Sequence, residues 1–129
     1  MACLAWSPRA EAQGVQAGQL LAGVAKVEIT NKTAAPINDP LYAKALVLKR
    51  GTTMAVLVTL DAVAVGEIGY IRNDYLGNVR ARLKDELKLL PENLIVNASH
   101  CHGRVGADAD DKTVQAVRAA AANLVPVLV

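Results

Sequence analysis

The pattern of apolar and polar positions divides this chain into short strand-like stretches and longer helical ones. In residues 20–30, Ala25, Val27 and Ile29 alternate with charged or hydroxyl-bearing neighbours. Because successive side chains of a strand point to opposite sides of a sheet, this alternation predicts a strand with one buried face. Two further β-rich runs, residues 42–48 and 54–60, flank a glycine-containing connection and predict a hairpin.

Two later stretches carry apolar residues three and four positions apart, which is typical of amphipathic helices. The apolar face of the first helix is predicted to contain Ile68, Ile71, Tyr75, Leu76, Val79, Leu83 and Leu87. Its opposite face is rich in charge and is interpreted as a solvated surface. The second helix can be capped by Asp110 or Asp111 and is predicted to align Val114, Val117, Ala121 and Leu124.

A short apolar run, residues 94–96, lies between the two helices and predicts a buried strand. Another apolar run, residues 125–129, follows the second helix, and we expect it to be poorly packed or to lie on an open edge. The order is therefore β-ββ-α-β-α-β, which predicts an α/β fold with a mixed β-sheet and flanking helices in layers, in an incomplete domain.

Composition narrows the class of protein. The chain has 129 residues, enough for one domain, and 53% of them are hydrophobic while only 3% are aromatic. The core should therefore consist of small aliphatic side chains. The net charge is +2, without a basic stripe, so nucleic-acid binding is not expected. No apolar run approaches the roughly 18 residues of a membrane span, so we expect no transmembrane segment.

Residues 1–13 differ from residues 14–129, which form the predicted domain. The leader is apolar at its start, and Ala10 and Ala12 form the small-x-small pattern of a signal-peptidase site. Two interpretations stay open: the remnant of a signal peptide, which implies an exported or periplasmic protein, or a disordered leader.

The candidate chemistry lies directly after residues 94–96, where Ser-His-Cys-His contains both histidines of the chain. If the strand geometry continues, His100 and His102 lie on one side and can share a metal ion. The alternative is a pair of surface histidines without a ligand. Zinc needs a third protein ligand, for which Cys101, Asp61 and Asp108 are candidates.

Other acidic residues have structural alternatives as well. Asp61 stands where a strand ends, so it can be a helix cap, a strand-end residue or a residue of the site. Asp108, Asp110 and Asp111 follow the histidines closely in sequence. They can ligate a metal, cap the second helix or face solvent.

Two motifs together resemble the opening of the neutral/alkaline, non-lysosomal ceramidase family. They are Asp-Pro-Leu-Tyr-Ala-Lys-Ala at residues 39–45 and Ala-Ser-His-x-His at residues 98–102, and the spacing matches over residues 22–103. The resemblance implies an exported, zinc-dependent amidase that cleaves the N-acyl bond of ceramide, a lipid amide. It also implies that His100 and His102 bind the metal, with Asn38 and Asp39 at the rim of the site.

The chain departs from this family at three places. Asn38 replaces a histidine ligand that precedes Asp-Pro-Leu in the family, and Cys101 replaces a threonine, with a different continuation after His102. The remaining family ligands, a glutamate and a tyrosine, and the active-site serine lie beyond residue 129. The chain is thus predicted to be the N-terminal portion of such an enzyme, inactive alone, or a metal-free binding or structural module. In both cases the loops of Asn38 and of His100 should face each other at one end of the sheet.

Overall fold

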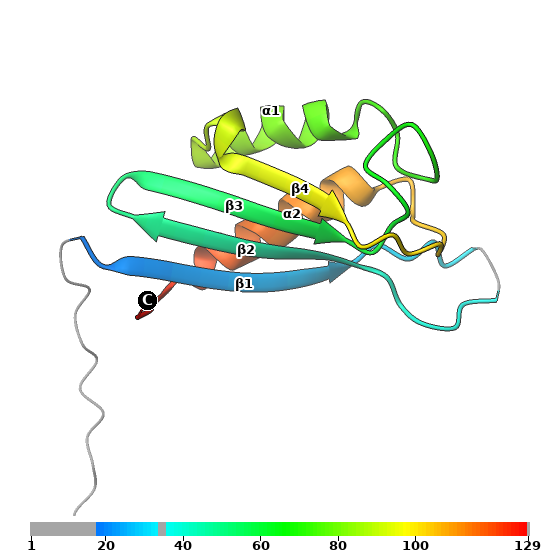
Figure 1. The fold of residues 1–129 in the computed structure, drawn as a ribbon, viewed down its shortest axis with the longest axis horizontal. Coiled ribbons are helices and arrows are strands. Elements are labelled where there is room, and N and C mark those ends of the chain that lie inside the picture. The colour runs from blue at the N-terminus through cyan, green and yellow to red at the C-terminus, as the bar shows by residue number, and fades with distance from the viewer. Residues whose placement is uncertain (1–17, 34–35, 129) are drawn as a thin grey trace, which may run out of the picture.

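A five-stranded sheet with two helices organises the chain in the computed structural model, which describes residues 18–33 and 36–128 (Figure 1). The strand order is β4-β3-β2-β1-β5. The elements are β1 (Leu20–Glu28), β2 (Tyr42–Arg50), β3 (Thr53–Leu60), α1 (Tyr75–Leu87), the 3-10 helix η1 (Pro91–Asn93), β4 (Leu94–Ala98), α2 (Ala109–Ala122) and β5 (Val125–Pro126).

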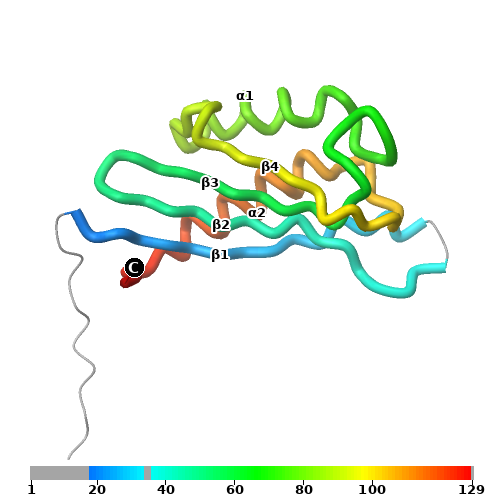
Figure 2. Tube along the Cα trace, viewed as in Figure 1, coloured from blue at the N-terminus to red at the C-terminus, as the bar shows by residue number. Residues whose placement is uncertain are grey.

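The sheet is mixed, as the sequence predicted. β1, β2 and β3 are successive antiparallel neighbours, and β3 pairs with β4 in parallel after the chain crosses over through α1 (Figure 2). The predicted hairpin is confirmed, and it turns at Gly51, whose φ of 58° lies in the left-handed region that suits glycine. The predicted α/β class with a layered, mixed sheet is therefore confirmed.

The core lies on one face of the sheet, where α2 passes behind β1 and β2 (Figure 1). Alternate residues of the central strands point into it, and the side chains are small, as the composition predicted. The fully buried ones from β2 and β3 are Ala43, Val47, Val56, Val58 and Leu60. Gly23 of β1 lies so close to the carbonyl of Ala120 in α2 that a Cβ would overlap it.

The first helix begins seven positions later than Ile68, where the predicted apolar face began. α1 starts at Tyr75, and Ile68 lies in a bend with 59% of its surface exposed. Gly66, Glu67 and Gly69 all have positive φ, which is incompatible with a right-handed helix. The rest of the predicted face is largely correct, because Tyr75, Val79 and Leu83 are buried.

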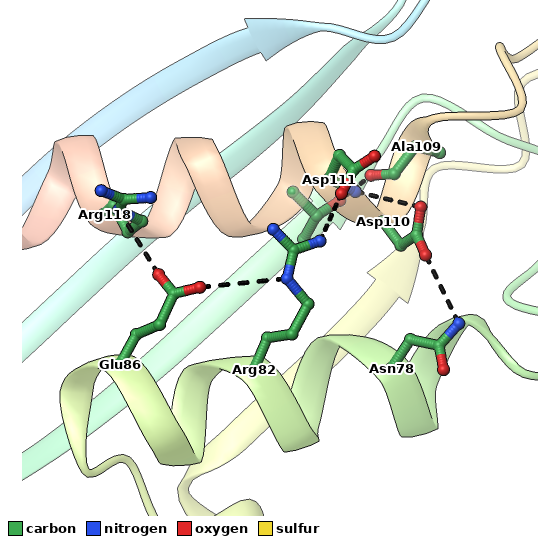
Figure 3. Close-up of polar contacts among 8 residues, drawn as sticks. Asn78, Arg82, Glu86, Ala109, Asp110, Asp111 and Arg118 are labelled. Atoms are coloured by element: carbon green, nitrogen blue, oxygen red, sulfur yellow. Dashed lines mark hydrogen bonds and ion pairs between the residues drawn. The ribbon is translucent and has the colours of Figure 1, made fainter.

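The second helix begins at Ala109, and Asp108 occupies the N-cap position without a side-chain capping bond. The prediction that Asp110 or Asp111 caps the helix is therefore wrong, since both lie in its first turn. Figure 3 shows that Arg82 of α1 pairs with Asp111 and with Glu86, whereas Arg118 of α2 pairs with Glu86. Part of the charged face of α1 thus binds its neighbouring helix.

The end of the described chain packs on an edge of the sheet. β5 pairs with Leu21 and Ala22 of β1, while Val125 is 56% exposed and Leu128 is 99% exposed. For residues 125–128 this confirms the prediction that the segment is poorly packed or lies on an open edge. The predicted leader, residues 1–13, lies outside the described residues. Within residues 18–33 and 36–128, no helix is long and apolar enough to cross a membrane.

Candidate functional site

Asp61 ties together the ends of three strands beside the histidines. Its carboxylate accepts hydrogen bonds from the backbone N–H of Tyr42 (3.0 Å), the ammonium group of Lys44 (2.8 Å) and the hydroxyl of Ser99 (3.3 Å). These donors belong to β2 and to the residue that follows β4. Of the alternatives open for Asp61, the structure supports the strand-end role, because its oxygens are engaged in holding the strand termini.

His100 is held in one orientation by the backbone of the loop after β3. The amides of Ser99 and Cys101 donate to the carbonyls of Leu60 and Ala62, so the strand pairing is extended around His100. The His100 ring places Nδ1 3.0 Å from the carbonyl oxygen of Val63. Because a carbonyl can only accept, Nδ1 carries the proton in this bond, so in the neutral imidazole Nε2 has the lone pair.

His102 lies edge-on to His100, with 4.9 Å between the ring centroids and 85° between the ring planes. This closeness does not come from a continued strand, which was the condition under which His100 and His102 were expected on one side. β4 ends at Ala98, and His100 adopts a left-handed conformation with φ of 60°. The loop geometry therefore brings the two exposed imidazoles together.

A cleft of about 470 Å³ lies beside His102. His102 and Cys101 line it from one loop, and Asn38 and Asp39 line it from the other. The segment after His102 is fixed to the end of β1, since the amide of Asn31 donates to the carbonyl of Arg104 (2.9 Å). The prediction that the two loops meet at one end of the sheet is confirmed for His102 and Asn38. The residues lining the cleft do not include His100 or Asp61.

The donors present fit only part of a zinc shell. His100 and His102 offer two nitrogens, and Asn38 offers an amide oxygen, which is a poorer ligand for zinc than imidazole. Among residues 18–33 and 36–128, no group of three or more His, Cys, Asp or Glu side chains could hold a metal ion.

The other candidate ligands have partners in and around α2. Asp108 pairs with Lys112 (3.0 Å), Asp110 accepts from the side chain of Asn78 (3.4 Å), and Asp111 pairs with Arg82. These contacts support the structural alternatives for all three acids.

Sequence reasoning missed two groups at this end of the sheet. Arg104 lines the cleft, and its position two residues after His102 was an available signal. The carbonyl of Val63, which orients His100, carried no signal in the sequence because a main-chain group has no residue type to recognise.

No protein-family model matches this chain, and no curated protein matches it significantly. Its fold is similar to that of two solved structures. One is a neutral ceramidase from Pseudomonas aeruginosa, with a TM-score of 0.68 and 22% sequence identity over 84% of this chain. The other is a ceramidase complexed with C2, with a TM-score of 0.69 and 20% identity, again over 84% of this chain.

The match spans only 22% of the length of each of these two proteins. At this level of identity the likeness concerns the fold. The resemblance drawn from the two sequence motifs is thus confirmed as a shared neutral ceramidase-like fold.

Proposed function

We propose that this chain is the N-terminal portion of a ceramidase-like amide hydrolase, in which His100 and His102 supply two ligands of a zinc site and the substrate is an N-acyl lipid. One observation carries the proposal. The centroids of two imidazole rings lie 4.9 Å apart; the ring of His102 lines a cleft, and that of His100 is oriented by a backbone carbonyl. Metal-binding histidines commonly have this arrangement, in which the second ring nitrogen donates to a carbonyl or carboxylate.

The residues of this chain would bind the zinc ion and orient the two histidines that hold it. The Val63 carbonyl keeps the proton of the neutral His100 ring on Nδ1, so the lone pair of Nε2 is available to coordinate zinc. His102 lies against the His100 ring and also lines the cleft. When bound, zinc would supply Lewis-acid polarisation of the amide carbonyl and a lowered pKa of a bound water. The third ligand and the groups that bind and attack the amide would come from polypeptide outside this chain.

A second candidate function is a metal-free binding or structural module with the same fold. Asn38 favours it, because this cleft-lining residue occupies the position at which the family motif has a histidine. Export to the periplasm or the cell exterior is part of either proposal. The small-x-small pattern in residues 10–12 supports it.

Isothermal titration with zinc chloride tests the proposed site on the purified, untagged chain. We expect the wild type to bind zinc weakly and His102→Ala to lose binding. Asn38→His should bind zinc at least about tenfold more tightly than the wild type, which corresponds to roughly 1.4 kcal/mol. Asn97→His is the matched control, because it adds the same side chain at an exposed position that does not line the cleft.

Three results would change the proposal. Tight zinc binding by the wild type would mean that another group, such as Cys101, completes the shell. Equal affinities for the wild type and Asn38→His would show that position 38 does not face the histidines. Wild-type affinity in His102→Ala would favour the metal-free module. Hydrolysis of an N-acyl substrate is not expected from the chain alone.

A further inference from the structure

Four large aliphatic side chains form a continuous row on the face of the sheet that the helices leave open. The strand register places Val24 opposite Leu46, Leu46 opposite Leu57, and Leu57 opposite Ile95. The row thus crosses β1, β2, β3 and β4. Figure 1 looks onto this face, with α2 behind it. Val24 is 69% exposed, Leu57 41% and Ile95 59%.

The rows on either side of this aliphatic row differ in chemistry. One neighbouring row contains Ala22, Leu48 and Ala55, and continues the apolar surface. The other contains Lys26, Lys44, Thr59 and Asn97. A shallow groove of about 480 Å³ lies over the centre of the face and is lined by both lysines and by three residues of the aliphatic row.

The positive charge beside the row is not fully neutralised. The Lys44 ammonium pairs with Asp61 at the strand end. The Lys26 ammonium lies 4.5 Å from the centre of the Tyr42 ring, an arrangement that leaves its charge in place. The three rows just described contain no carboxylate, and Glu28, one row further along β1, pairs with Lys32. The face is therefore an apolar stripe with a cationic border whose charge is paired with a carboxylate at Lys44 and not at Lys26.

A sheet face that meets only water normally carries polar side chains at these positions. Contiguous exposed apolar surface marks interaction sites on soluble proteins. We infer that this face packs against another polypeptide surface, one that carries an apolar row with a carboxylate beside it, placed over Lys26. This inference does not depend on metal binding at the histidine cleft.

Charge argues against a second copy of this chain as the partner. A two-fold axis parallel to the strands would stack the lysine row on itself. An axis perpendicular to the strands, in the plane between the sheets, would stack the lysines on the alanine row. When the two aliphatic rows stack on each other, neither arrangement places a carboxylate directly over Lys26, because Glu28 of the copy lies one row further along the strand. The shared fold is 22% of the length of the two ceramidase chains, so in such proteins most of the polypeptide lies outside it and is available as a partner.

Two synthetic peptides test the proposal by fluorescence anisotropy at low salt. Both have valine at every second position, and the intervening positions are Glu in one peptide and Lys in the other. We expect the acidic peptide to bind the wild type at least about tenfold more tightly than the basic peptide. Lys26→Glu should reverse this preference, and Leu57→Asn should abolish binding of both peptides. Lys84→Glu, the same charge change on α1, should leave the preference unchanged.

Circular dichroism of each variant establishes that it is folded. The proposal would be overturned if the wild type bound neither peptide or bound both equally. It would also be overturned if Leu57→Asn bound the peptides like the wild type, because the peptide would then lie on a strand edge. Sedimentation velocity of the wild type measures whether the chain forms a dimer. A dimer that Leu57→Asn dissociates would show that the occupant is a second copy.

Discussion

The two faces of this sheet are built from similar aliphatic residues but differ in what covers them. On β3, Val56 and Val58 point to the helices and are 0% and 1% exposed, whereas Leu57 between them points outward and is 41% exposed. The covered face stabilises this chain, since its side chains leave water when the chain folds. The open face contributes little until a partner covers it. Hydrophobicity alone therefore does not reveal which residues of a strand form the core.

The sharpest test of this difference compares two leucines of β3. Leu60 is fully buried, so Leu60→Ala should lower the free energy of unfolding by about 2–5 kcal/mol. Leu57→Ala should lower it by less than about 1 kcal/mol, because the side chain is already in contact with water. Urea denaturation followed by circular dichroism measures both. Equal losses would mean that the open face is part of the core of the isolated chain.

A second comparison concerns how closely α2 packs on the covered face. Gly23→Ala should lower the free energy of unfolding by about 1–3 kcal/mol, because its methyl group would overlap the Ala120 carbonyl and displace the helix. Gly77→Ala is the matched control, since no atom lies within 4 Å of the added Cβ on α1. It should raise the free energy of unfolding by up to about 1 kcal/mol. Thermal denaturation would contradict this account if Gly23→Ala were neutral.

The smallest expected effect concerns the buried hydrogen bond between Tyr75 of α1 and Thr113 of α2. The Tyr75 hydroxyl lies 2.8 Å from the Thr113 hydroxyl, and burial raises the pKa of Tyr75 to about 12 from an ordinary value of 10.0. Since the folded state holds the phenol proton to higher pH, the stability from this group is complete below pH 10 and is lost as pH rises towards 12.

By pH 11 this loss should reach about 1.4 kcal/mol. Tyr75→Phe should remove that part of the pH dependence and cost about 1 kcal/mol at pH 7 through the lost hydrogen bond. Urea denaturation of both chains between pH 7 and pH 11 supplies the measurement. Parallel pH profiles would show that Tyr75 ionises equally in the folded and unfolded states.

β1 could be predicted from the sequence because Ala25, Val27 and Ile29 alternate with polar residues. β2 and β3 could be predicted as apolar runs on either side of a turn, but such runs do not show which face of the strand is covered. The start of α1 could not be predicted, since Ile71 keeps the helical spacing and is 4% exposed although it lies outside the helix. A buried loop residue gives the same apolar signal as a helical one. The loop differs from the helix by the positive φ values at Gly66 and Gly69. In the sequence, the only indication of these values is that both residues are glycine.

The candidate site was predictable in part for a related reason. The pairing of His100 and His102 followed from their proximity in sequence, whereas the left-handed conformation of His100 and its bond to Val63 depend on a backbone that folds from two distant strands. The aliphatic row was equally hidden. It exists only through the register of four strands, and no single stretch of sequence contains it.

In the described part of the chain β4 pairs with a strand on one side only, and its five residues join β3 after a crossover of more than thirty residues. Parallel pairing over such a separation closes late in folding, and an edge strand opens at a lower free energy than the strands inside the sheet. His100 and His102 lie two and four residues after the end of β4, so opening of β4 would release the loop that holds them. Any ligand that binds both imidazoles would therefore also hold β4 in the sheet and slow hydrogen exchange of its amides.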